Sequence, residues 1–390
     1  LRSRGLGDVY KRQRSTMSEK KASNLTKMCL GLSYLEPGSP LKAYALIKEC
    51  DKEPELLWKR PDALRDKIVA LFDESFFSKI KFVLSEEFFE YIDRELTAFG
   101  IKAVTYFDRD YPDFFREMPD PPLTLFCRGD TALLKKTPAL AVVGTRKNTS
   151  YGRRVTEHFV GELANDFVIV SGLALGIDSL AHRTALAKKG KTVAVLGGGL
   201  NNVYPYVNKG LAQEIAENGG LVFSEFKPSA ESSAFQFPMR NRLIAALSDG
   251  VLLVEAGMKS GAFGTIDFAT EMGKHLFVVP GEIYNFASGG ANEIIKSYPG
   301  CMVTAPEEIR TRFLLEKFRG TKGKKAVQLS QNEQLVVELL KTDRLHFNEL
   351  LSRSKIKTGE LSYLLSVLEL KGLITKLPGN NYQLDAEAFL

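Results

Sequence analysis

The sequence predicts an α/β fold in which a parallel sheet carries helices on both faces, flanked by a small helical domain and a small C-terminal domain. Between Pro138 and Thr304, short apolar runs alternate with helical segments, which is typical of βα units and of a buried parallel sheet. Before Gly100 and after residue 329, apolar residues recur mainly at helical spacing. We expect strands at ALAVVG, DFVIVSG, TVAVLGG, GLVFSE, GVLLVEA, HLFVVPG and CMVT.

The composition is that of a globular protein. The 390 residues suffice for two or three domains, with 44% hydrophobic and 26% charged residues. No run of 18 apolar residues occurs, so we expect no membrane insertion. The four cysteines and four histidines are scattered without metal-ligand spacing, which predicts no metal site and a reducing, cytoplasmic location.

The formal net charge of +6 is concentrated at the beginning of the chain. Residues 1–16 hold five basic residues and one acid, and Met17 opens a sequence typical of a native start. We therefore interpret residues 1–16 as a non-native leader and leave them out of the fold. Without their net +4 only +2 remains, so a nucleic-acid site has to be a local patch.

The remaining residues divide into four parts. Residues 17–105 are expected to form a helical domain, as LKAYALIKEC, LRDKIVALF and FFEYIDRELTAFG indicate, and residues 106–312 the sheet-containing core. Residues 106–130, rich in proline and aromatic side chains, are interpreted as a connector packed on the sheet. Residues 313–328 are interpreted as a solvated linker, because they contain the basic, glycine-bearing stretch EKFRGTKGKKA.

Residues 329–390 predict a winged helix. The amphipathic segments QNEQLVVELLK, FNELLSRS and TGELSYLLSVLELKG precede two short strands around a Pro-Gly-Asn turn. The expected recognition helix, Thr358–Leu370, contains Glu360 and Glu369 and no arginine. Because base reading in the major groove relies on Arg, Asn or Gln, we interpret this domain as a partner-binding or dimer-supporting module.

The stretch TVAVLGGGLNNVYP is typical of a strand that enters a phosphate-binding turn. A dinucleotide fingerprint requires Gly-x-Gly-x-x-Gly; Gly197 and Gly199 fit, but Asn202 occupies the third position. The acid that should follow about 20 residues later is also missing, since Glu225 lies further on. We therefore expect no dinucleotide and no other cofactor.

Two earlier turns carry further anion-binding signals. In VVGTRKNTSYG, Gly144 directly follows a strand, and Arg146 could contact phosphate oxygens with both arms of its guanidinium. In IVSGLALGIDSLAH, Ser171, Gly172 and Gly176 allow close backbone approach before a helix that begins near Asp178.

Asp178 and His182 are interpreted as structural residues. Asp178 is expected to cap this helix and His182 to hydrogen-bond to Asp178. A catalytic triad of these two residues with Ser171 is disfavoured, because the Gly-x-Ser-x-Gly elbow is absent.

Two later segments complete the expected site. FQFPMRNRLIAALSDG places Arg240, Asn241 and Arg242 at the start of an amphipathic helix, just after Phe237. One or both arginines could instead pair with acids at the strand ends, namely Glu225 or Glu255, and the sequence leaves this open. VLLVEAGMKSGAFGT supplies Ser260 and Gly261 in another turn.

The sequence contains, in this order, GTR, SGLALGID with AH, AVLGGGLNNVYP, SE, FPMRNRLIAALS, VEAGMKSGAFGT and VPG. This series resembles the DprA/Smf (DNA-processing protein A) family over roughly Tyr111 to Val303. The resemblance implies a Rossmann-like core, a SAM-like helical domain before it and a winged helix after it. It implies a bacterial cytoplasmic homodimer that binds single-stranded DNA, protects incoming DNA and loads RecA recombinase in natural transformation, with single-strand-binding protein as an additional partner.

The resemblance also assigns site residues. Arg146 would be the central phosphate contact, the glycine turns would line an anion pocket, and the FPMRN segment would complete it. Two departures occur: Tyr206 stands where the family has a basic residue, which suggests aromatic stacking, and SGAFGT replaces an SGSLIT-like run. The full set of expected DNA-binding residues is Gly144, Arg146, Ser171, Gly172, Ala174, Gly176, Gly197, Gly199, Tyr204, Tyr206, Phe237, Arg240, Asn241, Arg242, Ser260 and Gly261.

The residue types support single-strand binding independently of the resemblance, because single-strand binding uses phosphate cradles interleaved with aromatic faces.

We expect no catalytic activity, but one enzymatic alternative stays open. Enzymes of the related lysine-decarboxylase-like (LOG) fold hydrolyse nucleotides with a Pro-Gly-Gly-x-Gly-Thr-x-x-Glu motif. In this sequence Phe268 occupies the position of the catalytic glutamate. Glu225 and Glu255 could still form a carboxylate pair for N-glycosidic cleavage. A second alternative is a protein-interaction adaptor.

Overall fold

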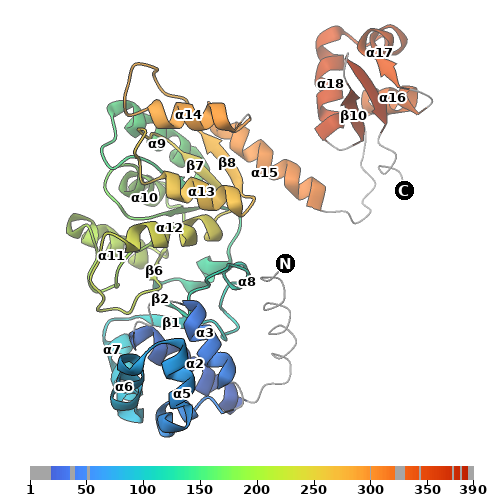
Figure 1. Cartoon of the computed structure of the whole chain (residues 1–390). Helices are drawn as coiled ribbons and strands as arrows, with labels where there is room; N and C mark the ends of the chain where they lie inside the picture. Colours follow the sequence, from blue (N-terminus) through green and yellow to red (C-terminus); the bar gives the residue numbers. More distant parts are fainter. Residues whose placement is uncertain are drawn as a thin grey trace. The chain divides into compact units, whose positions relative to one another are not determined.

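The computed structural model describes residues 19–35, 40–50, 53–298, 300–320, 330–341, 344–370, 373–377 and 380–384 (Figure 1). The chain divides into two compact units, Leu1–Pro306 and Glu307–Leu390. Residues 1–16, interpreted above as a leader, lie outside the described residues. Within the described residues, no helix combines the length and apolar character that crossing a membrane requires.

The first part of the larger unit is helical, as the apolar spacing predicts. Asp73 and Ser85 begin two of its helices by accepting hydrogen bonds from the amides of Phe76 and Phe88. Buried apolar side chains such as Met28 and Ile80 join it to the core of the unit. Its elements are α2 (Glu19–Leu35), α3 (Pro40–Glu49), α4 (Leu56–Lys59), η2 (Pro61–Leu64), α5 (Arg65–Leu71), α6 (Glu74–Val83) and α7 (Glu86–Ala98).

An eight-stranded sheet forms the centre of this unit, in the order β1-β2-β6-β5-β4-β3-β7-β8. Strands β3 to β8 are parallel, and β1 and β2 add an antiparallel edge. The strands are β1 (Lys102–Thr105), β2 (Thr124–Gly129), β3 (Ala139–Val143), β4 (Val168–Ser171), β5 (Thr192–Val195), β6 (Leu221–Ser224), β7 (Gly250–Leu253) and β8 (His275–Val278).

Expectations about the strands were wrong in three places. Strand β1 lies within residues 17–105, which were expected to be helical. The CMVT segment forms only an isolated bridge between Met302 and Val278. The connector, 106–130, contains strand β2, which pairs with β6, and the short helix α8 (Asp113–Arg116). In this strand the residues from Thr124 to Cys127 are buried, so they extend the sheet rather than only covering it.

Helices cover both faces of the sheet, which confirms the doubly wound prediction. Helices α9, α10 and α11 pack side by side on one face, and α12 and α13 pack together on the other (Figure 1). Strand β3 lies between β4 and β7, so the winding direction reverses there, and ligands bind such sheets at this crevice. The bounds are η3 (Thr131–Lys135), α9 (Ser150–Leu163), α10 (Ile177–Ala187), η4 (Tyr206–Asn208), α11 (Lys209–Glu217), α12 (Gln236–Leu247), α13 (Phe263–Glu271) and α14 (Gly289–Ser297).

The C-terminal unit has the predicted winged-helix elements. Its sheet is antiparallel in the order β10-β11-β9, and capping boxes at Ser330 and His346 begin two of its helices. Residues 313–320, expected to begin a linker, continue helix α15, and residues 321–329 lie outside the described residues. The elements are α15 (Pro306–Gly320), α16 (Gln331–Leu340), β9 (Leu345–His346), α17 (Phe347–Ser354), α18 (Thr358–Leu370), β10 (Ile374–Leu377) and β11 (Asn381–Leu384).

Candidate functional site

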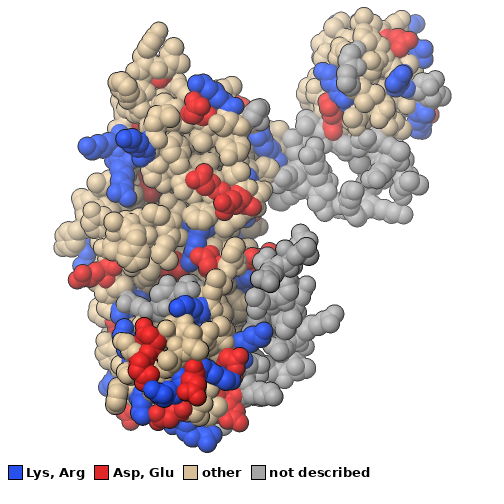
Figure 2. Space-filling model, viewed as in Figure 1, with Lys and Arg blue, Asp and Glu red and all other residues tan. Residues whose placement is uncertain are grey.

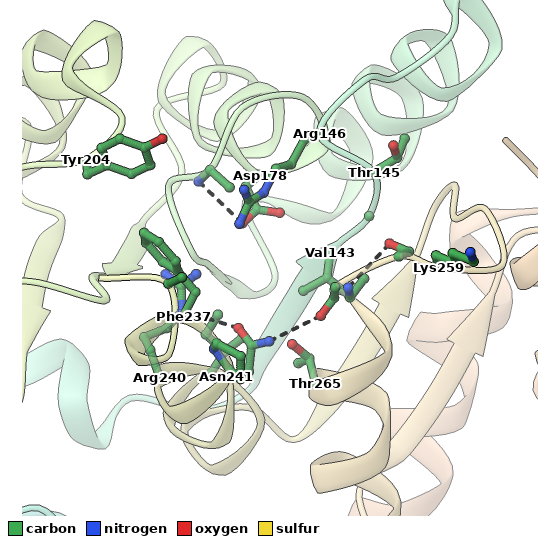
Figure 3. Close-up of a pocket in the computed structure, with 18 of the residues that line it drawn as sticks. Val143, Thr145, Arg146, Asp178, Tyr204, Phe237, Arg240, Asn241, Lys259 and Thr265 are labelled. Atoms are coloured by element: carbon green, nitrogen blue, oxygen red, sulfur yellow. Dashed lines mark hydrogen bonds between the residues drawn. The ribbon is translucent and has the colours of Figure 1, made fainter. Parts of the chain in front are cut away.

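A cavity of about 840 Å³ opens at the carboxyl ends of β3 and β7, where the winding direction reverses (Figure 3). In Figure 3, Tyr204 and Phe237 lie on one side of it and Lys259 on the opposite side. The residues expected at the site that line it are Gly144, Arg146, Ala174, Tyr204, Phe237, Arg240, Asn241, Ser260 and Gly261.

The turn after β3 is held by backbone contacts. The Thr145 amide donates to the Glu255 carbonyl at 2.7 Å, and the Thr145 carbonyl accepts from the Ile177 amide at 3.2 Å. A Cβ at Gly144 would lie 2.8 Å from the Glu255 carbonyl oxygen, so only glycine permits this approach. The turn is therefore fixed before any ligand arrives.

Arg146 projects from this fixed turn into the cavity mouth. Its side chain is exposed, and its guanidinium carbon lies 5.5 Å from the centre of the Phe237 ring. Among the described residues it forms no ion pair; Glu255 instead accepts hydrogen bonds from the Thr149 amide (2.8 Å) and hydroxyl (2.6 Å). The positive charge of Arg146 is thus available to a ligand.

Two aromatic rings extend the surface next to Arg146. The Tyr204 and Phe237 ring centres lie 5.6 Å apart, and Tyr204 is 55% exposed. Tyr206 lies outside the cavity lining, exposed, with the Lys209 amino group 5.7 Å from its ring centre. Figure 2 shows Lys and Arg side chains gathered beside α10, at the edge of an otherwise largely uncharged surface.

The opposite rim comes from the turn after β7 and the start of α13. The Asn241 side-chain amide donates to the Gly261 carbonyl at 3.2 Å, which joins α12 to this turn. Nothing lies within 4 Å of a Cβ placed at Gly261, so this part of the rim is open.

The backbone of the turn after β4, which was expected to approach an anion, is engaged by Asp178. The Asp178 carboxylate accepts hydrogen bonds from the amides of Gly172 (3.1 Å) and Ala174 (3.4 Å). Asp178 is also not the N-cap of α10; Gly176 is, with φ of 78°. Burial raises the pKa of Asp178, and the nearby Arg240 charge opposes that shift.

Arg240 lies at the cavity floor and is almost fully buried. Its Nη1 donates to the carbonyls of Gly172, at 2.6 Å, and Val195. Burial lowers its pKa to about 10, and Asp178 opposes that shift. Ser171 is likewise buried, and its hydroxyl donates to the Val142 carbonyl at 2.7 Å. Both side chains therefore tie strand ends together.

Arg242 lies outside the cavity lining. It is 3% exposed and forms ion pairs with Glu225 at 2.6 Å and Asp120 at 2.9 Å. For Arg242 the structure thus bears out the alternative that the sequence left open. Burial raises the pKa of Glu225, and the Arg242 guanidinium opposes that shift.

The glycines after β5 are packed against the protein instead of lining the cavity. A Cβ at Gly197 would lie 2.8 Å from the Phe237 ring, and one at Gly199 would collide with the backbone of residues 227–230. The Gly199 amide donates to the Ala230 carbonyl at 2.9 Å. These glycines therefore allow the segment that carries Phe237 to approach the sheet.

His182 does not hydrogen-bond to Asp178 as expected. Its Nδ1 lies 2.7 Å from the Thr192 hydroxyl oxygen, and burial lowers its pKa to about 3. Neither Glu225 nor Glu255 is among the described residues that line the cavity. Across the described residues, no three His, Cys, Asp or Glu side chains gather as a metal site would require.

Comparison with known proteins identifies the family. The family model described as DNA recombination-mediator protein A matches residues 102–313, and the one described as DprA winged helix domain matches residues 321–380. The chain belongs to the DprA/Smf family. Its sheet, helices and winged helix agree with the fold that the resemblance implied.

Named relatives in the DprA/Smf family cover much of the chain. It is 38% identical to DNA processing protein DprA of Bacillus subtilis over 54% of this chain and 72% of that protein. It is 40% identical to the Streptococcus pneumoniae protein of the same name over 59% of this chain and 82% of that protein. The X-ray structure of the latter superposes with a TM-score of 0.61 at 33% identity, covering 75% of this chain and 98% of that chain.

The cavity-lining residues of this DprA/Smf protein that were not assigned from the sequence include the polar residues Thr145, Lys147, Ser232, Lys259 and Thr265. Lys147 and Lys259 each lie within three residues of a glycine in a turn that follows a strand, a signal that could have found them. Ser232 is brought to the cavity by a long loop, and no local pattern marks it.

Proposed function

We propose that this DprA/Smf protein binds single-stranded DNA along the cavity mouth and acts as a recombination mediator during DNA uptake. The observation that carries the proposal is Arg146, an exposed cation fixed on a rigid turn, next to Phe237 and Tyr204. Cations that follow a backbone and rings on which bases stack are the two components of sequence-tolerant single-strand binding.

Further steps belong to the same proposal. The family description as a DNA recombination mediator supports protection of incoming DNA and loading of RecA recombinase, with single-strand-binding protein as a further partner. We propose that the protein acts as a cytoplasmic homodimer. We assign the winged helix to partner binding, since Glu360 and Glu369 make the outer part of α18 a poor surface for duplex DNA.

We further propose that the protein has no catalytic role. Glu225 and Glu255, the carboxylates considered for N-glycosidic cleavage, are hydrogen-bonded to protein groups; Glu255 is buried and the Glu225 side chain is only 8% exposed. Incubation with nucleoside monophosphates should release no free base. Release that depends on either glutamate would favour the nucleotide-hydrolysing alternative.

Arg146→Ala tests the proposed function. The loss of one charge-assisted phosphate contact should weaken single-strand binding by about 10- to 100-fold for every oligonucleotide sequence. The slope of log affinity against log salt should become shallower by about 0.7. Arg146→Lys should recover part of the affinity, because an ammonium lacks the planar fork.

Arg153→Ala is the matched control, since Arg153 is an exposed arginine on α9 whose nearest carboxylate is Glu157 on the same helix. It should leave affinity and salt slope nearly unchanged. Equal losses in both variants, or equal wild-type affinity for single strands and duplex at moderate salt, would contradict the proposal.

A further inference from the structure

The loop between β8 and α14, residues 282–288, exposes three large apolar side chains. Ile283 is 79% exposed, Tyr284 86% and Phe286 96%. In Figure 1 this loop extends beyond α14, and Figure 2 shows it as a narrow, mostly uncharged projection. Such exposure of two neighbouring rings is uncommon on a surface with no binding role.

The backbone of the loop is held in place. At its base, Asn292 hydrogen-bonds to both the amide and the carbonyl of Gly281, each at 3.0 Å. At its tip, Asn285 accepts from the Ala287 amide through its side chain (3.0 Å) and from the Ser288 amide through its carbonyl (2.9 Å). The rings are therefore presented by an ordered turn.

The loop adjoins the rim of the cavity. Strands β7 and β8 are parallel neighbours, so the turns that follow them emerge at the same edge of the sheet. A Cβ at Gly257 would lie 3.0 Å from the Phe286 carbonyl oxygen, and a Cβ at Gly289, the first residue of α14, would lie 3.8 Å from the Met258 side chain. The next residue, Lys259, lines the cavity.

We propose that Tyr284 and Phe286 form a second stacking platform for single-stranded DNA, reached by bases that leave the cavity past Lys259. The proposal rests on the proposed function. Lys259 followed by the rings of Tyr284 and Phe286 repeats the arrangement of Arg146 with Phe237 and Tyr204 at the other side of the cavity. Base stacking on aromatic rings tolerates any sequence, which suits a surface without directed polar groups.

Glu282, exposed at the start of the loop, argues for bases rather than phosphates as the contacting groups. A carboxylate there repels a backbone but leaves the ring faces open to a base. The strand should therefore cross the loop with its bases turned toward the rings.

Tyr284→Ala with Phe286→Ala tests the platform through the length dependence of binding. Oligothymidylates of about 4 to 20 nucleotides should gain affinity with length in the wild type, as longer strands reach the loop. The double variant should bind the shortest strands normally and lose about 5- to 150-fold for the longest. Arg146→Ala should weaken every length, so failure of the proposed function is distinguishable from failure of the platform.

Two further variants separate stacking from general apolar contact. Phe286→Trp should keep the long-strand affinity, whereas Phe286→Leu should lose it, because leucine is apolar but has no ring. Phe82→Ala, an exposed phenylalanine on α6, is the matched control and should have no effect.

Photocross-linking gives a direct measurement. A long oligonucleotide with 5-iodouracil at single positions should cross-link to the peptide that contains Tyr284 and Phe286 at some positions, and to the one with Phe237 at others. Cross-links confined to the Phe237 peptide, or length dependence that survives in the double variant, would overturn the proposal. A change of oligomeric state in the double variant without a change in long-strand affinity would also overturn it, in favour of a second copy on the loop.

Discussion

Two halves of the same sheet edge look alike in sequence and differ in structure. The turns after β3 and β7 form an open half, where Arg146, Lys259 and Gly261 face the cavity. The turns after β4 and β5 form a closed half, where Asp178 and the segment 227–237 already occupy the backbone that glycines expose. A glycine-rich turn thus predicts close approach, and the approaching group can belong to the protein itself.

The largest effect should come from a buried ion pair outside the cavity. Arg242→Ala leaves the buried Glu225 carboxylate without its partner, so the free energy of unfolding should fall by about 3–5 kcal/mol. Arg146→Ala, in the open half, should change it by about 0.5 kcal/mol or less. Urea denaturation of both variants measures this contrast, and similar losses would remove the distinction between a buried, ion-paired arginine and an arginine of the open half.

A pair of glycines tests the distinction between the open and closed halves without charge. Gly199→Ala should destabilise the protein by about 1–3 kcal/mol or more, because the new methyl meets backbone atoms that cannot move aside. Gly261→Ala meets nothing within 4 Å and should be nearly neutral in thermal unfolding. Equal melting temperatures for the two variants would show that the closed half can relax.

The stability of the sheet-containing unit should also depend on pH through the buried His182. Its pKa is lowered to about 3 in the folded protein, against about 6.5 in an unfolded chain, so the unfolded state binds more protons between these values. Stability should fall as pH falls below about 6.5, by up to about 1.4 kcal/mol per pH unit. Urea unfolding between pH 5 and 7.5 should show this slope in the wild type and lose it in His182→Asn; parallel curves would refute it.

The smallest expected effect is on single-strand affinity, and it tests which tyrosine belongs to the open half. Tyr204→Ala removes a ring that packs beside Phe237 at the cavity mouth and should lower single-strand affinity by about 5-fold or more. Tyr206→Ala, outside the lining, should lower it less. Fluorescence anisotropy with one oligonucleotide compares them, and a larger loss at Tyr206 would move the binding path toward α11.

The sheet was predictable because each buried parallel strand leaves a short apolar run that few other structures produce. Strand β2 was hidden by the prolines that precede it. That the side chains of Arg240 and Arg242 point in different directions could have been predicted from the sequence, since residues two apart on a helix do not share a face. The occupation of the β4 turn by Asp178 was not, because the sequence shows an acid near the helix start but not which amides of that turn it accepts from.

The carboxylate of Asp178 accepts the hydrogen bonds that the amides of the turn after β4 could otherwise give to a bound anion. A strand lying across this protein finds those amides already engaged, so its backbone charge is met mainly at the rim. Rim contacts between solvated charges are short-lived and salt-sensitive. Under the proposed mediator function, a strand held in this way is bound loosely enough to be passed to another protein.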